Sequence, residues 1–283
     1  PAAPTGGSTA LGRLIPMSTL HPFYRTLGDT GLRLSPLGLG TVKIGRNQGV
    51  KYPNGFDLPD DDAVRNLLAL AHDLGINLLD TAPAYGTSEH RLGPLLKGQR
   101  DNWIICSKVG EEFVEGQSHF DFSAKHTRHS VERSLQRLGT DRLDLVLVHS
   151  DGNDLEVLDQ EVYPTLAQLK QEGLILAYGF SGKTVAGGLR ALQQGDCAMV
   201  TYNLREQAER EVLDFALQHN KGILIKKALA SGHVCLNGED PVRKSLELVL
   251  GHPGVTSAII GTITPSHLAQ NVSAALSVLS SME

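Results

Sequence analysis

Short apolar runs alternate with amphipathic segments along most of the chain. The run Leu-Asp-Leu-Val-Leu-Val at 143–148 predicts a strand buried on both faces, which is typical of a parallel sheet. Between such runs, apolar residues recur every three or four positions, which predicts helices. The pattern therefore predicts a regular alternation of strands and helices.

The segment from Asp60 to Gly75 shows how clearly one helix is marked. Asp60 and the two acidic residues after it can cap the start of a helix and favour its positive end. Gly75 is a common terminator. The apolar positions between them follow at helical spacing: Val64, Leu67, Leu68, Ala71 and Leu74.

Eight strand–helix units follow a short hairpin that turns at 28–31. Strands are expected at 37–41, 76–80, 103–107, 143–148, 177–180, 198–202, 222–226 and 255–260, and helices at 60–75, 88–96, 123–139, 155–172, 184–193, 206–219, 241–251 and 265–279. Eight units without a compositional break predict an α/β protein, a single (β/α)8 TIM barrel preceded by a short N-terminal β-hairpin. Two Rossmann halves fit less well, because Gly38 and Gly40 are not followed by the third glycine of that motif.

Composition narrows the class of protein. The 283 residues carry a net charge of −5, so a basic nucleic-acid surface is not expected. No apolar run reaches the roughly 18 residues of a membrane span. The three cysteines, Cys106, Cys197 and Cys235, encode neither a disulfide framework nor a metal site, and indicate a reducing, cytoplasmic compartment. Residues 1–16 are expected to be an irregular leader outside the native fold, and 17–283 the barrel domain.

Ionisable residues follow three consecutive strands of the predicted barrel. Asp80 closes the second strand, Lys108 the third and His149 the fourth, and Tyr85 lies in the loop after the second. In this fold the carboxyl ends of the strands form the active site, so these side chains can converge. An ammonium lowers the pKa of a neighbouring phenol, a carboxylate orients the ammonium, and an imidazole can polarise a carbonyl. The set suits the protonation of an oxyanion as a hydride reaches carbon.

Three motifs resemble those of the aldo-keto reductase family. They are Leu79-Asp-Thr-Ala-Pro-Ala-Tyr-Gly86, Cys106-Ser-Lys-Val109, and Val131-Glu-Arg-Ser-Leu-Gln-Arg-Leu-Gly-Thr-Asp141 followed by Asp144-Leu-Val-Leu-Val-His149. The resemblance implies reversible, NADPH-dependent reduction of a small aldehyde or ketone. It assigns Tyr85 as general acid, Lys108 as the group that lowers its pKa, Asp80 as the partner of Lys108, and His149 as the donor that orients substrate.

The resemblance also implies the residues that would bind the cofactor. They are Thr41, Val42, Asp80, Ser181, Gly182, Met199, Lys226, Ala228, Leu229, Gly261, Thr262, His267 and Asn271. Two side-chain amides expected around the nicotinamide are replaced, by Gly182 and Met199. Lys226 stands where an aromatic residue or Arg often covers the ring, so we expect its side chain to point elsewhere.

The nucleotide end departs from the family as well. Gly261 and His267 replace the Lys and Arg that usually hold the 2′-phosphate of NADPH, and a neutral His cannot form the bidentate contact of an Arg. NADPH remains the expected cofactor, with NADH as the alternative.

Two other functions stay open. The missing cofactor contacts would suit a nucleotide-binding regulatory module with little turnover. A Schiff-base lyase could use Lys108, although the Asp80–Tyr85 arrangement argues against it. Aromatic and acidic residues of the first and third loops either wall the substrate pocket or pack on the barrel rim: Tyr52, Phe56, Glu111, Glu112, Phe113, Phe120 and Phe122.

Overall fold

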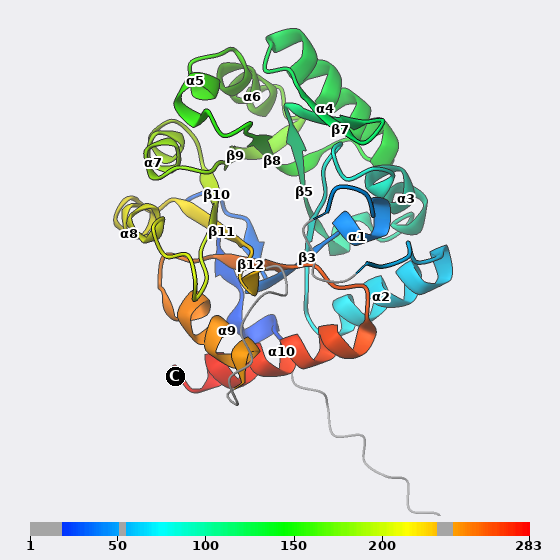
Figure 1. The fold of residues 1–283 in the computed structure, drawn as a ribbon, viewed down its shortest axis with the longest axis vertical. Helices are drawn as coiled ribbons and strands as arrows, with labels where there is room; N and C mark the ends of the chain where they lie inside the picture. Colours follow the sequence, from blue (N-terminus) through cyan, green and yellow to red (C-terminus); the bar gives the residue numbers. More distant parts are fainter. Residues whose placement is uncertain (1–18, 51–54, 231–239) are drawn as a thin grey trace, which may run out of the picture.

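The computed structural model describes residues 19–50, 55–230 and 240–283. The predicted leader at 1–16, Tyr52 and Cys235 lie outside these residues. Eight strands pair in parallel around a closed barrel (Figure 1). In barrel order they are β3 (Leu37–Gly40), β4 (Leu78–Asp80), β5 (Ile104–Val109), β8 (Leu143–His149), β9 (Ile175–Ser181), β10 (Cys197–Thr201), β11 (Gly222–Lys226) and β12 (Ser257–Ile260). The predicted TIM barrel is confirmed.

Helices connect the strands and form the outer ring of the barrel (Figure 1). They are α2 (Asp61–Asp73), α3 (Ser88–Leu95), α4 (Ala124–Leu138), α5 (Asp154–Leu158), α6 (Val162–Gln171), α7 (Val185–Gln194), α8 (Arg210–His219), α9 (Pro241–Gly251) and α10 (Pro265–Ser280). Asp60 caps α2 by accepting a hydrogen bond from the backbone N–H of Ala63 at 2.8 Å, as its position predicts.

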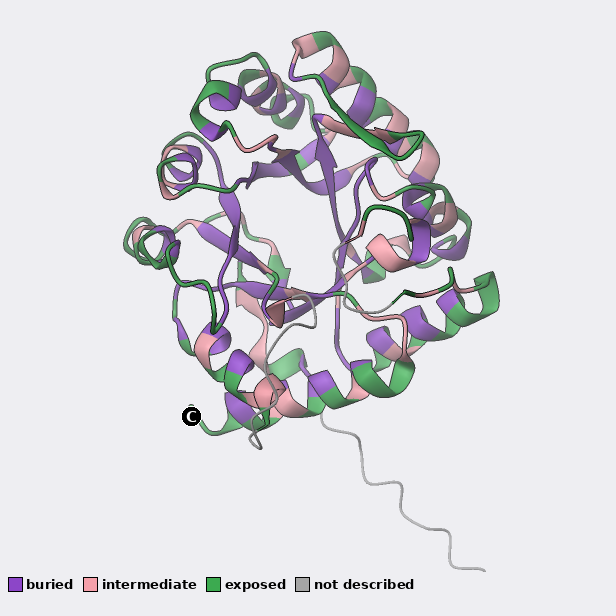
Figure 2. Ribbon diagram, in the orientation of Figure 1, coloured by how far each residue is buried: buried purple, intermediate pink, exposed green. Residues whose placement is uncertain are grey.

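The hydrophobic core has two layers. One lies between the strands and the helices, whose buried faces turn toward the barrel (Figure 2). The other fills the barrel and includes inward-facing residues such as Leu78, Leu145 and Met199. The expected N-terminal hairpin, β1 (Arg25–Thr26) and β2 (Arg33–Leu34), adds Leu27 and Leu34 to this inner cluster. The hairpin therefore plugs the barrel at the end away from the carboxyl ends of the strands.

The single helix expected at 155–172 is wrong, because the structure divides it into α5 and α6. Pro164 explains the break. A proline has no N–H for the helical bond to the carbonyl four residues earlier, and its ring would clash with that carbonyl. Here Pro164 lies in the first turn of α6, where neither penalty applies.

Four short elements were not expected. Two are 3-10 turns, η1 (His21–Phe23) and η2 (Arg100–Asn102), and α1 (Val42–Gly45) is one helical turn in the first loop. The fourth is a hairpin of β6 (Glu111–Val114) and β7 (Gln117–Phe120) in the third loop. Its two-residue turn has φ 51° at Glu115 and φ 78° at Gly116. The first turn residue is Glu115, although Glu rarely adopts positive φ. The sequence therefore lacks the Asn-Gly or Asp-Gly pair that usually marks such a hairpin.

Candidate active site

The barrel brings Asp80, Lys108 and His149 to one end. Asp80 and His149 are the last residues of β4 and β8, and Lys108 is the last but one of β5. These strands are neighbours and run parallel, so their carboxyl ends open at the same face. Tyr85 reaches this face from the loop between β4 and α3.

Two glycines hold the Tyr85 loop close to α1. A Cβ on Gly45 would lie 2.1 Å from the backbone O of Tyr85, and a Cβ on Gly86 would lie 2.0 Å from the backbone O of Gly45. The backbone N–H of Thr87 donates to Gly45 O at 3.1 Å. Only residues without a side chain allow this approach, so α1 positions Tyr85 through backbone contact.

Lys108 and Asp80 form a buried ion pair. Nζ of Lys108 lies 2.6 Å from Oδ1 of Asp80 and also donates to the backbone O of Thr81 at 3.0 Å. Burial is the largest single cause and opposes the ammonium form, but the charge and hydrogen bond of Asp80, together with Tyr85 and Cys106, outweigh it and raise the pKa of Lys108 above its ordinary value. Lys108 is therefore a fixed cation.

Tyr85 lies against this cation and against His149. Nζ of Lys108 is 4.7 Å from the centroid of the Tyr85 ring, and the Tyr85 and His149 rings meet edge to face at 6.1 Å between centroids. Burial raises the pKa of the Tyr85 phenol above its ordinary value, while the charge of Lys108 acts in the lowering direction. The phenol therefore remains protonated at neutral pH, the form that a general acid needs.

His149 has a carboxylate partner that the motifs did not reveal. Nδ1 of His149 lies 2.9 Å from Oε2 of Glu111, on the β6–β7 hairpin. Burial lowers the pKa of His149 below its ordinary value, and Glu111 opposes that shift. Burial alone would raise the pKa of Glu111, but His149, Ser118 and Arg46 outweigh it and lower that pKa to about 2.

Next to His149 lies a second cluster at the ends of β9 and β11. Ser181 pairs with His149 in the β8–β9 register. Lys226 turns toward Ser181: its Nζ donates to Ser181 Oγ at 3.1 Å and to the backbone O of Gly182 at 2.7 Å. Burial, together with the charges of Lys227 and Lys183, lowers the pKa of Lys226 to about 8. These donors and acceptors suit a carboxamide, so the residues present fit a nicotinamide group.

Gly182 has a structural reason to be a glycine. A Cβ there would lie 2.6 Å from Oδ2 of Asp154 and 2.8 Å from the ring of Phe180. Asp154 is buried, and the same oxygen accepts hydrogen bonds from the backbone N–H groups of Lys183 and Thr184 at 2.8 and 2.9 Å. The Asp154 carboxylate therefore occupies the space that a larger residue at 182 would need.

Two further cofactor candidates near the tetrad of Asp80, Tyr85, Lys108 and His149 have structural roles. Met199 belongs to the inner core and is 2% exposed, so it offers apolar surface and no amide. The Thr41 hydroxyl donates to the backbone O of Asp80 at 2.8 Å and accepts from Ser88 Oγ at 2.7 Å. Thr41 thus supports the strand end that carries Asp80. Val42 begins α1 beside it, and Ala228 and Leu229 follow β11.

The nucleotide-end candidates gather at the start of α10. Gly261 and His267 are exposed, while Asn271 is 9% exposed on the buried side of α10. Oγ1 of Thr262 accepts a hydrogen bond from the Thr264 N–H at 3.2 Å. No side chain of the described residues caps α10, so the first N–H groups of this helix can face an anion.

A parallel barrel with a phenol, an ammonium, a carboxylate and an imidazole at its carboxyl face holds the groups that acid–base chemistry needs. The aldo/keto reductase family model matches residues 36–245. The chain therefore belongs to the aldo-keto reductase family, a family of oxidoreductases, and the resemblance of the motifs is confirmed. Among the described residues, no helix is long and apolar enough to cross a membrane.

Individual relatives span nearly the whole chain. A Pseudomonas aeruginosa protein assigned to the aldo-keto reductases is 66% identical, with a TM-score of 0.87 over 94% of this chain and 99% of its own. The holo form of an aldo-keto reductase from Bacillus halodurans is 25% identical, with a TM-score of 0.74 over 89% and 90% of the two chains. L-galactose dehydrogenase of Arabidopsis thaliana is 28% identical over 289 residues, covering 88% of this chain and 87% of its own.

Proposed function

We propose that the chain catalyses reversible, NADPH-dependent reduction of small aldehydes or ketones, with Tyr85 as general acid. The observation that carries the proposal is the buried Lys108–Asp80 pair, 2.6 Å apart, with the Lys108 ammonium 4.7 Å from the centroid of the Tyr85 ring. A fixed cation beside a phenol stabilises the phenolate that forms when the proton leaves. Dehydrogenase names among the relatives support an oxidoreductase reaction.

Each residue of the tetrad has one task in this proposal. The bound nicotinamide supplies the hydride. Tyr85 gives its proton to the carbonyl oxygen as negative charge develops there. Lys108 stabilises the resulting phenolate, and Asp80 holds Lys108 in place and charged. His149, whose ring meets the Tyr85 ring edge to face, hydrogen-bonds the substrate oxygen and orients it.

The cofactor would lie along the carboxyl face from β9 to α10. Ser181 and Lys226 would hold the nicotinamide carboxamide, because their polar atoms already meet there. The N–H groups at the start of α10 and Thr262 would contact phosphate, and Asn271 the adenine. NADPH is proposed ahead of NADH, with His267 in the first turn of that helix. A cytoplasmic location belongs to the same proposal, since the described cysteines, Cys106 and Cys197, are free and buried.

The test is turnover with both nicotinamide nucleotides. The full chain is mixed with NADPH or NADH and a panel of reactive aldehydes and ketones, including nitrobenzaldehyde, and cofactor oxidation is followed by absorbance. Tyr85→Phe should remove most activity and leave nucleotide affinity unchanged, because the hydroxyl acts only in proton transfer. Nucleotide binding without turnover of any carbonyl would overturn the proposal and favour the regulatory module.

A further inference from the structure

Glu111 brings a negative charge to the back of the candidate active-site histidine. The β6–β7 hairpin folds it over the carboxyl end of the barrel, where its Oε2 lies 2.9 Å from Nδ1 of His149. Both side chains are largely shielded, with 13% of Glu111 and 22% of His149 exposed. The pair is separate from the Lys108–Asp80 pair, and nothing in the tetrad roles requires it.

Glu111 is held as a carboxylate. Ser118, across the hairpin, donates its hydroxyl to Oε1 at 2.7 Å. Arg46 is the nearby cation: it donates to the backbone O of Ala84 at 3.1 Å and covers the Phe113 ring at 3.5 Å. Hydrogen bonds and a nearby positive charge both favour the ionised form, and the pKa of Glu111 falls to about 2.

An ionised Glu111 restricts where His149 carries its protons. A carboxylate oxygen 2.9 Å from Nδ1 repels a lone pair on that nitrogen and attracts a proton, so this contact favours a proton on Nδ1 although its alignment falls short of a hydrogen bond. The neutral ring then has its proton on Nδ1, and Nε2 presents a lone pair. Nε2 gains a proton only when the ring becomes a cation.

We propose that Glu111 is a positioning residue that fixes His149 as the Nδ1–H tautomer, so that Nε2 accepts from a substrate hydroxyl when the ring is neutral and donates to a carbonyl oxygen only when the ring is protonated. This inference rests on the proposed function, since it gives the preferred direction of the same reaction at a given pH. The neutral ring favours alcohol oxidation, and the cationic ring favours carbonyl reduction.

The charges around His149 set the pH at which its ring gains or loses the second proton. Glu111 faces it from β6 and favours the cation, while Lys108 on β5 and Lys226 on β11 disfavour it, as does burial. Tyr85 meets it from the loop after β4 as a neutral phenol. The combined effect lowers the pKa of His149 below its ordinary value, so the ring is mostly neutral at pH 7. Nε2 of the neutral ring then accepts a hydrogen bond, which suits the hydroxyl of an alcohol.

The tautomer can be measured without turnover. Two-bond proton–nitrogen NMR of the ¹⁵N-labelled full chain distinguishes the Nδ1–H and Nε2–H forms, and the signals of His149 are assigned from their loss in His149→Asn. We expect Nδ1–H in the native chain at pH 7.5 and a large Nε2–H fraction in Glu111→Gln, whose amide can also donate. Glu112→Gln is the matched control, because the neighbouring Glu112 contacts Arg133 and His126 instead. An Nε2–H ring in the native chain would overturn the inference.

A second readout uses both directions of the reaction across pH. In the native chain, kcat/KM for carbonyl reduction should fall about tenfold per pH unit above the pKa of His149, because only the cation donates. Glu111→Gln should flatten that fall, and Glu112→Gln should keep it. An equal loss at every pH in both variants would assign Glu111 a merely structural role and contradict the proposal. If no carbonyl turns over at all, the proposed function fails, whereas the NMR result still decides the tautomer.

Discussion

At the scale of single residues, the Lys108–Asp80 pair combines stability and chemistry. Its side chains are 1% and 5% exposed, so Lys108→Met would leave a buried carboxylate unpaired. Such a loss costs about 3–5 kcal/mol of unfolding free energy, measured by urea denaturation. Activity should fall about 10²- to 10⁴-fold, because the phenolate of Tyr85 loses its cation.

The double variant Asp80→Asn/Lys108→Met separates the two effects. With neither charge present, most of the unfolding free energy should return, since no unpaired ion remains buried. Activity should stay as low as in Lys108→Met. Recovery of activity in the double variant would show that Lys108 does not act on Tyr85.

Lys226 gives a prediction about cofactor affinity and pH. Burial is the largest cause that lowers the pKa of Lys226, to about 8, so the side chain is mostly charged below pH 8 and mostly neutral above it. Beside Ser181, the ammonium would repel the cationic ring of an oxidised nucleotide but not the neutral ring of a reduced one. The preference for NADPH over NADP⁺, measured by calorimetric titration, should therefore decrease as pH rises through 8. Lys226→Met should abolish this dependence, and a parallel change in both affinities in the native chain would refute it.

Most of the tetrad could be predicted from sequence, because a residue that ends a strand is placed at the carboxyl face by the barrel itself. Asp80, Lys108 and His149 needed only three correctly located strands. The Glu111–His149 contact depends instead on a two-residue turn with Glu115 at positive φ, and the residue types in that turn do not predict it. The direction of the Lys226 side chain was also beyond sequence, because it depends on the space beside Gly182.

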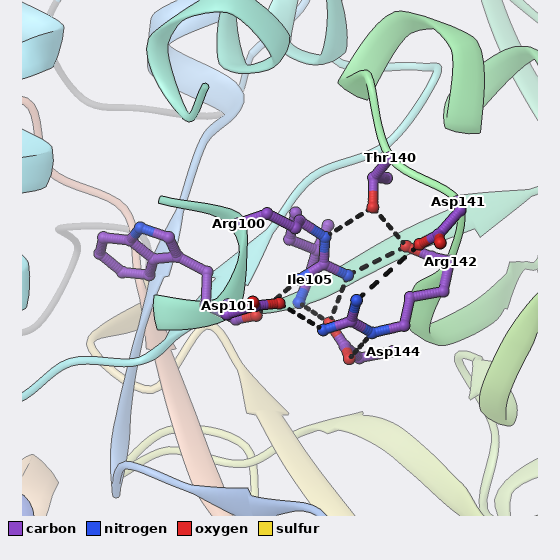
Figure 3. A network of polar contacts seen from close by, with 8 residues as sticks. Arg100, Asp101, Ile105, Thr140, Asp141, Arg142 and Asp144 are labelled. Carbon is purple, nitrogen blue, oxygen red and sulfur yellow. Dashed lines mark hydrogen bonds and ion pairs between the residues drawn. The ribbon is translucent and has the colours of Figure 1, made fainter. Parts of the chain in front are cut away.

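At the scale of elements, β5 and β8 are joined at their amino ends by a polar network (Figure 3). Asp144, 2% exposed, accepts from the backbone N–H of Ile105 and from Arg100, both at 2.8 Å. Arg100 also donates to Thr140 Oγ1 at 2.8 Å and to the backbone O of Arg142 at 2.9 Å. One carboxylate thereby fixes the strand pair that carries Lys108 and His149 at its other end.

Asp144→Ala should therefore destabilise the chain without affecting the chemistry. It leaves the guanidinium of Arg100 and the N–H of Ile105 without this acceptor, and loss of one partner of a buried pair costs about 3–5 kcal/mol. Thermal unfolding should show the loss, while kcat of the folded enzyme should stay near the native value. Asp141→Ala is the control, because that side chain is 94% exposed in its contact with Arg142. A loss of kcat with unchanged stability would contradict this division.

Element boundaries were predicted well where caps mark them and poorly where a break lies inside a helical pattern. Asp60 and Ser123 cap α2 and α4 as their sequences indicate. The apolar periodicity at 155–172 continues across the break before α6, so spacing alone joins two helices. Only Pro164, three residues into α6, marks the new first turn.

At the scale of the whole molecule, the barrel separates function from stability. Its carboxyl face carries the candidate active site, and the β1–β2 hairpin packs Leu27 and Leu34 into the other end of the inner core. The contact is tight, since a Cβ on Gly222 would lie 2.2 Å from Cδ1 of Leu27. Leu27→Ala should leave a cavity and cost about 2–5 kcal/mol of unfolding free energy.

Because the hairpin lies at the far end, the folded Leu27→Ala enzyme should keep its kcat and its affinity for nucleotide. Leu217→Ala offers a matched control: it removes the same atoms from a side chain that is 51% exposed, and should change stability by no more than about 0.5 kcal/mol. Chemical denaturation and turnover measured on the same samples compare the two leucines directly. If Leu27→Ala lowered kcat in the folded state, the inner core would have to transmit strain along the barrel to the tetrad, and the two ends would not be independent.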